Sequence, residues 1–200
     1  MSAFEDACAV EAAAASKYLM PFLRRYSSGL VTTEKGRLSR ELQVKYGDVF
    51  LNSSASGEFV SVELKAERVH TGNLFIETWS NRRTRRRGRL DHLDADLLFY
   101  FFLDSEMLYC IDLPGLQDWA FGKDPGLGHL QDFREVRQGC RVQHNDTWGR
   151  LVPVAVVLRA VKSTAWSLSN PSDPLPCPIE GLDRRGVPSP VAYSDGSLFP

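Results

Sequence analysis

Two apolar runs on either side of a polar turn decide the fold: Gly47-Asp48-Val49-Phe50-Leu51-Asn52 and Phe59-Val60-Ser61-Val62-Glu63-Leu64-Lys65. The turn, residues 53–58, consists of Ser, Ala, Gly and Glu, which is typical of a β-hairpin loop. Counting outward from it pairs Asn52 with Phe59 and places Asp48 opposite Glu63, where β-carbons on neighbouring strands lie roughly 5 Å apart. Two carboxylates that close repel each other, and a divalent cation between them would remove the conflict.

The second run alternates polar and apolar side chains. Side chains of successive strand residues point to opposite faces, so Ser61, Glu63 and Lys65 share one face and the apolar residues share the other. The apolar face is expected in the core. Lys65 then stands beside the carboxylates, where its ammonium can orient an attacking water or offset charge on a phosphate. Asp and Glu oxygens are ligands that Mg²⁺ prefers, so the set suits metal-assisted phosphodiester cleavage.

With this spacing, Asp48, Glu63 and Lys65 resemble the motif of the PD-(D/E)XK nuclease superfamily. That family has the restriction-endonuclease-like fold and includes Holliday junction resolvases and many phage nucleases; the likeness covers residues 1–120. It implies that Asp48 and Glu63 bind Mg²⁺, for which Mn²⁺ can substitute, and that Lys65 assists catalysis. Gly47 stands where the family has proline.

Many family members carry a further glutamate on the first helix. An alanine-rich segment up to about Arg25 predicts such a helix here, and the resemblance then implies Glu11 as a catalytic residue. Glu5 is the alternative, although an acid in the first turn of a helix is explained by the helix dipole alone.

Three more residues are expected near the site. Residues 73–79 form a third apolar run after a turn over 67–72, which predicts a three-stranded meander with Glu77 near Glu63. Glu77 is then an additional ligand, an ion-pair partner of Lys65 or a solvated carboxylate. Gln43 and Ser61 are expected to support the site or contact substrate.

Six arginines lie within residues 82–89: Arg82, Arg83, Arg85, Arg86, Arg87 and Arg89. Such a run cannot pack into a core, and the planar guanidinium suits phosphate oxygens. An isolated charge run is more often a solvated loop. Next to the carboxylate pair, the run predicts a nucleic-acid-binding loop.

The rest of the chain predicts further core elements. Residues 97–103 suit a buried central strand, residues 107–113 a second strand, and Pro114 the start of an amphipathic helix. Residues 151–158 suit another strand, and Trp166 is expected to close the core. Three aspartates at positions 91, 94 and 96 suit either a turn with a helix cap or, less well, a metal cluster.

Composition limits the class of protein. The chain has 200 residues, 43% of them hydrophobic, enough for one good core, and its net charge of −1 excludes a globally basic nucleic-acid binder. Four scattered cysteines without a C-x-x-C pair and an N-terminus without signal-peptide features predict a cytoplasmic protein. The most apolar run is too short to span a bilayer, so no membrane is expected as a partner.

Together these observations predict an α/β protein with a restriction-endonuclease-like core, a mixed central β-sheet flanked by helices, over residues 1–169. The Pro- and Ser-rich residues 170–200 are expected to be disordered. The predicted function is that of a Mg²⁺-dependent DNA endonuclease, phage-like or resolvase-like, acting on duplex or branched DNA. Two alternatives stay open: a nucleic-acid-binding module without catalysis, and a protein-interaction domain on a nuclease scaffold. A homodimer also stays open, since a four-way junction presents two symmetric cuts.

Overall fold

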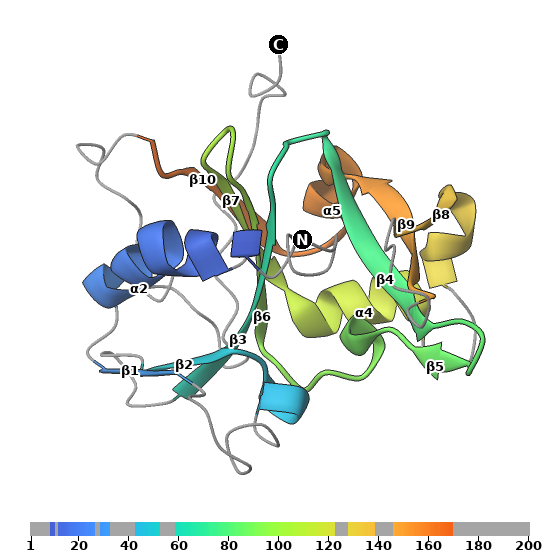
Figure 1. Ribbon diagram of the computed structural model, residues 1–200, viewed down its shortest axis with the longest axis horizontal. Coiled ribbons are helices and arrows are strands. Elements are labelled where there is room, and N and C mark those ends of the chain that lie inside the picture. Colours follow the sequence, from blue (N-terminus) through green and yellow to red (C-terminus); the bar gives the residue numbers. More distant parts are fainter. Residues whose placement is uncertain are drawn as a thin grey trace.

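Two β-sheets organise the part of the chain that the structure describes. The structure, a computed structural model, describes residues 9–10, 12–26, 29–32, 43–52, 59–122, 128–138 and 146–169. Glu5, Glu11 and the Pro-rich residues 170–200 lie outside these ranges, so the predictions made for them stay predictions. The chain is mixed α/β (Figure 1).

The large sheet has six strands in the order β1-β2-β3-β6-β7-β10. Its strands are β1 (Gly29–Thr32), β2 (Val49–Asn52), β3 (Phe59–Glu67), β6 (Leu97–Phe102), β7 (Met107–Asp112) and β10 (Ser163–Ser167). β3 and β6 are parallel and every other pair is antiparallel, so the sheet is mixed as predicted.

The small sheet has four strands in the order β5-β4-β9-β8. They are β4 (Asn73–Asn81), β5 (Arg86–Arg87), β8 (Glu135–Arg137) and β9 (Trp148–Pro153). The remaining elements are helical: η1 (Ala15–Leu19), α2 (Met20–Tyr26), η2 (Arg89–Asp91), α4 (Leu113–Phe121), η3 (Gly128–Asp132) and α5 (Val154–Ala160).

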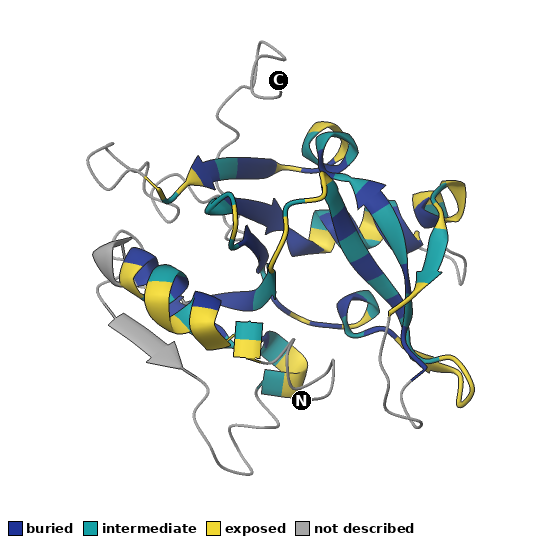
Figure 2. Ribbon diagram, turned by 45° about the horizontal axis from the view of Figure 1, so that its top comes forward, coloured by how far each residue is buried: buried dark blue, intermediate teal, exposed yellow. Residues whose placement is uncertain are grey.

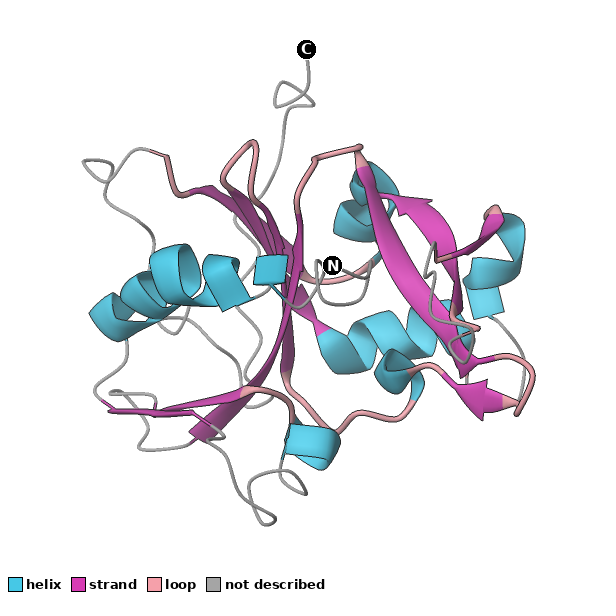
Figure 3. Cartoon of the chain, in the orientation of Figure 1, coloured by secondary structure: helices cyan, strands magenta, loops and turns pink. Residues whose placement is uncertain are grey.

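Strand β6 lies at the centre of the large sheet because both of its faces are apolar. All six of its residues are buried, as the run over 97–103 predicts, and Figure 2 shows this burial. On one face, Phe99 and Phe101 pack with Val62 of β3 and with Leu19, Phe22 and Leu23 of the first helix. On the other face, Leu98, Tyr100 and Phe102 pack toward α4 and the small sheet. Helices therefore lie on both sides of the large sheet (Figure 3).

Several sequence predictions are confirmed. The hairpin register has Asn52 opposite Phe59, β7 and α4 follow β6 in the predicted order, and residues 12–26 are helical. Trp166 is buried, and its ring lies 5.9 Å from that of Phe22 in an edge-on contact. No helix within the described residues is long and apolar enough to cross a membrane.

The predicted meander is wrong. β4 is a strand, but it pairs with β5 and β9 and not with β3. The free edge of β3 is taken by β6, whose two apolar faces require a central place in the sheet. Glu77 therefore does not lie opposite Glu63 in a β-ladder.

The strand predicted over 151–158 is half right. β9 ends at Pro153, and Val154 begins α5. Proline supplies no N–H for further pairing, and the Val154 N–H donates to the Gly72 carbonyl at 3.0 Å. A run of β-branched residues thus changes from strand to helix at the point where tertiary contacts favour the turn.

Candidate functional site

A glycine turn delivers Asp48 to the edge of the hairpin. Residues 43–46 form one helical turn, and the Gly47 N–H donates back to the Gln43 carbonyl at 3.1 Å. Gly47 has φ +97°, and a Cβ added to it would lie 2.7 Å from the Val62 carbonyl oxygen. Proline holds φ near −65°, so it cannot occupy this turn. Glycine is thus required by the backbone at this position, where the motif that the sequence resembles has proline.

The hairpin brings Asp48 and Glu63 together as the sequence predicts. Val49 pairs with Val62, so the next residues outward, Asp48 and Glu63, face each other on the same side of the sheet. The Asp48 N–H donates to the Val62 carbonyl at 2.8 Å, and one Asp48 carboxylate oxygen accepts from the Leu64 N–H at 2.9 Å. The Asp48 carboxylate is therefore held against the strand that carries Glu63.

Gln43 also lies at the site, as predicted. Its amide Nε2 donates to Asp48 Oδ1 at 2.7 Å, while its backbone carbonyl accepts a hydrogen bond from Arg89 Nη2 at 2.5 Å. Gln43 therefore links the aspartate to an arginine from a distant part of the chain, and its observed role is to support the site.

Glu63 is the most strongly perturbed acid of the site. Its side chain is buried, and burial together with the neighbouring Asp48 carboxylate raises the pKa of Glu63 to about 8. The positive charges of Arg89 and Lys65 oppose this rise. Near neutral pH a large fraction of Glu63 is therefore protonated unless further positive charge arrives.

Arg89 lies within this site. Its Nη2 is 2.9 Å from Glu63 Oε2 and 4.0 Å from Asp48 Oδ1. The contact with Glu63 is an ion pair without hydrogen-bond alignment, because Glu63 Oε2 accepts no hydrogen bond from any described residue. The sequence grouped Arg89 with the basic loop, whereas the structure places it beside the two acids. Gly88 makes the difference, because a Cβ there would lie 2.1 Å from the Glu77 carbonyl oxygen and would hold this segment away from β4.

Glu77 reaches the site by a different route from the predicted one. Its carboxylate accepts from the backbone N–H of Arg89 at 3.3 Å. Within the described residues it forms no ion pair with Lys65. Its observed contact is thus with the segment that carries Arg89.

Lys65 lies on the same face of β3 as Glu63, two residues further on. It pairs with Tyr100 in the parallel ladder, and its charge lowers the pKa of both Glu63 and Glu67. Among the described residues no carboxylate lies within ion-pair distance of Lys65. Its half-buried side chain is thus close to both acids without being bound to either.

Glu67 continues this polar row and was missed by sequence reasoning. Burial raises the pKa of Glu67, and the Tyr100 hydroxyl donates a hydrogen bond to its carboxylate. The same hydroxyl accepts from the Phe75 N–H of β4 at 3.0 Å, so this contact joins the two sheets. A Glu-x-Lys-x-Glu pattern on one strand face was the available signal.

Ser61, predicted to support the site, is used elsewhere. Its hydroxyl donates to Asp96 Oδ2 at 2.7 Å, and its backbone N–H donates to the same oxygen at 2.8 Å. Asp91 and Asp94 pair with Arg87 and Lys45. The three aspartates at 91, 94 and 96 therefore have separate partners on three different segments, and they form no metal cluster among the described residues.

The helix that would carry Glu11 packs on the other face of the large sheet. Its described residues Ala14, Leu19 and Leu23 contact the apolar face of β3, opposite to Glu63. Glu11 itself lies outside the described residues, so its part in the site stays a prediction.

The remaining arginines of the predicted loop lie on the β4–β5 turn and on β5. Arg82 pairs with Glu135, Arg83 with Asp146 and Arg87 with Asp91. Arg85 and Arg86 are exposed. Five of the six arginines thus lie at the surface, as the sequence predicts.

The donor set fits a divalent cation in part. Asp48 and Glu63 supply hard carboxylate oxygens from neighbouring strands, and Glu63 Oε2 is buried without a hydrogen bond. No cluster of three or more His, Cys, Asp or Glu side chains suited to a metal occurs among the described residues. A cation held here would be bound by these two side chains, with other ligands supplied by water or by substrate.

Comparisons of the chain with protein-family models, with curated proteins and with solved structures found no match. The resemblance noted in the sequence therefore rests on the chain's own residues. Asp48, Glu63, Lys65 and Arg89 are the residues whose geometry bears on function.

Proposed function

We propose that the protein is a metal-dependent nuclease that hydrolyses phosphodiester bonds in DNA. One observation carries the proposal: Asp48 and Glu63 meet across the β2–β3 hairpin, and Lys65 stands beside them on the same strand face. This is the arrangement that the Asp, Glu and Glu-x-Lys spacing implies for the PD-(D/E)XK superfamily. Asp48 and Glu63 would hold Mg²⁺, which supplies a Lewis acid and an activated water when bound.

The side chains have separate tasks in this proposal. Asp48 is held in place by Gln43 and the Leu64 N–H, so its orientation does not depend on substrate. Glu63 must lose its proton before it can act as a ligand, because burial and Asp48 raise its pKa to about 8. The Lys65 ammonium can then face the phosphate and offset the charge that develops on it.

The Arg89 side chain has two possible partners in this proposal, the acid pair and a phosphate group. In the present structure it lies against the carboxylate pair and offsets part of its charge. If Asp48 and Glu63 held a cation, the Arg89 guanidinium would no longer be needed to offset their charge. Its planar fork could then bind a phosphate oxygen beside the two acids.

A second function is favoured by the same arginine. Arg89 already offsets part of the charge of Glu63, so a metal is not the sole source of positive charge at the acid pair. The alternative is therefore a nucleic-acid-binding module that does not cleave. In that case the arginines matter for activity and the Asp48 carboxylate does not.

The deciding experiment is cleavage of labelled linear duplex, single-stranded and four-way-junction DNA with Mg²⁺, with Mn²⁺ and with chelator. Asp48→Asn should abolish metal-dependent cleavage. Asp94→Asn is the matched control, because this nearby aspartate is exposed and makes only a 3.9 Å ion pair with Lys45. If the wild-type protein cuts none of these DNAs yet retains them in a salt-sensitive way, the binding-module function takes the place of the nuclease.

A further inference from the structure

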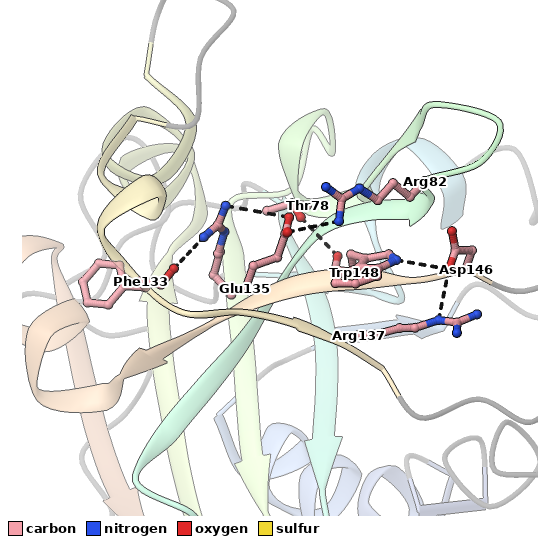
Figure 4. Close-up of polar contacts among 8 residues, drawn as sticks. Thr78, Arg82, Phe133, Glu135, Arg137, Asp146 and Trp148 are labelled. Carbon is pink, nitrogen blue, oxygen red and sulfur yellow. Dashed lines mark hydrogen bonds and ion pairs between the residues drawn. The ribbon is translucent and has the colours of Figure 1, made fainter.

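A second group of arginines and acids lies on the small sheet, and its acidic members lie beneath its basic ones. Glu135 of β8 is 3.0 Å from Arg82 and 3.7 Å from Arg150. Asp146, just before β9, is 3.0 Å from Arg137 and 3.8 Å from Arg83. Figure 4 shows this group with Arg82 and Arg137 on either side of Asp146.

A tryptophan fixes the group. The Arg82 guanidinium lies 4.5 Å from the centre of the Trp148 ring, and the indole N–H donates to Asp146 Oδ1 at 3.1 Å. The backbone N–H of Arg82 also donates to the Asp146 carbonyl at 2.9 Å, and the Thr78 hydroxyl donates to the Trp148 carbonyl at 3.2 Å. Arg82 therefore presents its guanidinium plane in a defined orientation.

The difference in exposure decides what this surface presents to solvent. Side-chain exposure is 46% for Arg82, 69% for Arg83 and 48% for Arg137. It is only 23% for Glu135 and 12% for Asp146. Arg150 is only 16% exposed, so three guanidinium groups face solvent above two largely buried carboxylates. The four arginines and two acids together carry a net charge of +2. Each guanidinium has five N–H donors, and the ion pairs leave several of them unused.

The neighbouring turn adds to this charge. Arg85 on the β4–β5 turn and Arg86 on β5 are exposed, and neither forms an ion pair with any described residue. The same segment then runs through Arg87 and Gly88 to Arg89 at the carboxylate site. The chain segment that carries these arginines thus runs from the small sheet to the Asp48–Glu63 pair.

We infer that Arg82, Arg83 and Arg137, set by Trp148 and Asp146, form a surface that binds the phosphodiester backbone of a nucleic-acid strand beside the cleavage site. The inference rests on the proposed nuclease function and extends it to the part of the substrate that is not cut. Planar forks held by acids beneath them suit phosphate oxygens, which accept from two N–H groups at once. Arg137 lies far from the arginine run in the sequence, and only the pairing of β8 with β9 brings it there.

The test measures binding with cleavage switched off. Fluorescence anisotropy of labelled 30-nucleotide single-stranded and duplex DNA is followed in chelator over a series of salt concentrations. The slope of log affinity against log salt should fall by about 0.7 to 0.9 for each phosphate group that the protein no longer neutralises. For the triple variant Arg82→Gln/Arg83→Gln/Arg137→Gln, the slope should therefore fall by about 2 to 3. Comparison of the two DNAs identifies the preferred strand form.

Two further variants control for misfolding and for nonspecific loss of charge. Arg83→Gln alone removes the most exposed arginine and the longest ion pair, so it should fold normally and lower the slope by about 1. Arg159→Gln is the matched control, since Arg159 is exposed on α5 and bonds only to the Ala155 carbonyl of its own helix. An unchanged slope in both Arg83→Gln and the triple variant overturns the inference. A competition result can also overturn the inference. If poly-glutamate displaces the labelled DNA as effectively as unlabelled DNA does, the partner of this surface is an acidic protein.

Failure of this surface can be told apart from failure of the nuclease. With Mg²⁺, the triple variant should keep its rate on bis(p-nitrophenyl) phosphate, which is too small to reach the arginine surface, and should cleave the long DNA more slowly. Equal falls in rate on both substrates overturn the inference. Absence of cleavage in the wild-type protein, with salt-sensitive binding that the triple variant weakens, removes the nuclease and keeps the surface.

Discussion

Two regions of this molecule use the same residue types in opposite proportions. At the hairpin, Asp48 and Glu63 share one arginine, with Lys65 nearby, and the pKa of Glu63 is raised to about 8. On the small sheet, Glu135 and Asp146 share four arginines. The first region is short of positive charge and suits a cation, while the second has an excess and suits an anion. The proportion of acids to arginines, and their order from core to surface, thus distinguishes the two regions.

The largest difference between the regions should appear on replacement of Lys65. Lys65→Ala should lower metal-dependent DNA cleavage on the order of a hundredfold or more, because it removes the ammonium that the proposed function directs at the phosphate. DNA binding in chelator should stay nearly intact, since the arginine surface is untouched. Rates on labelled DNA and anisotropy measure the two effects. Lys45→Ala, at an exposed lysine, is the control, and cleavage by Lys65→Ala at the wild-type rate would contradict the proposal.

The pH dependence of stability tests the shortage of positive charge at the hairpin. The pKa of Glu63 is about 8 in the folded protein against an ordinary value of 4.5, so between these pH values the folded state holds a proton that the unfolded state has released. The free energy of unfolding should therefore fall as pH rises from about 5 to 8, on the order of a few kcal/mol, because one pKa unit corresponds to about 1.4 kcal/mol. Glu63→Gln should abolish this fall, as measured by urea unfolding at pH 5 and pH 9.

The acid of the other region provides the contrast. Glu135→Gln should lower stability at both pH values, because it removes the anion that Arg82 and Arg150 share.

Mg²⁺ at pH 9 should stabilise the wild-type protein and have little effect on Glu63→Gln. A wild-type stability that is flat between pH 5 and pH 9 would show that Glu63 is not a buried, poorly compensated acid.

Gly47 should affect the hairpin region alone. Gly47→Ala places a Cβ 2.7 Å from the Val62 carbonyl at φ +97°, which should cost about 1–3 kcal/mol of unfolding free energy. Metal-dependent cleavage should fall with it, because the turn holds Asp48. The salt dependence of DNA binding should not change. Gly72→Ala is a matched control, since Gly72 also has positive φ but has open space around it.

The smallest effect is expected from Arg89. Arg89→Ala removes the guanidinium that offsets part of the charge of Glu63. Added Mn²⁺ should therefore raise the melting temperature of this variant more than that of the wild-type protein. A difference of about 3 °C corresponds to about 1 kcal/mol in a domain of this size. Arg87→Ala, which removes only the exposed ion pair with Asp91, should leave the Mn²⁺ effect unchanged. An equal Mn²⁺ effect in Arg89→Ala and wild type would show that Arg89 and the cation do not compete.

Local patterns in the sequence were sufficient for the hairpin and insufficient for the second sheet. The register that joins Asp48 to Glu63 follows from a short turn and alternating side chains, and the buried β6 follows from an unbroken apolar run. The pairing of β4 with β9 joins residues as far apart as Asn73 and Pro153, and no local pattern specifies it.

The same reason explains the differences at the site. Arg89 was grouped with its neighbours in the run, although one glycine is enough to turn it toward Glu63. Glu77 was placed by counting around a turn that does not form a hairpin. Arg137 and Trp148 gave no sequence signal at all, because their role depends on strands that meet only in the folded protein.

The pairing of β4 with β9 has a consequence for synthesis on the ribosome. β1, β2 and β3 can pair as soon as residue 67 has left the exit tunnel, but β4 has no partner along most of its length until residues 148–153 follow. During that interval Leu74 and Ile76, which are buried in the finished protein, lie on a strand with an open edge. A nascent chain that stalls while residues 148–153 are still inside the tunnel should therefore bind chaperones or aggregate, while one that stalls after they have emerged should not.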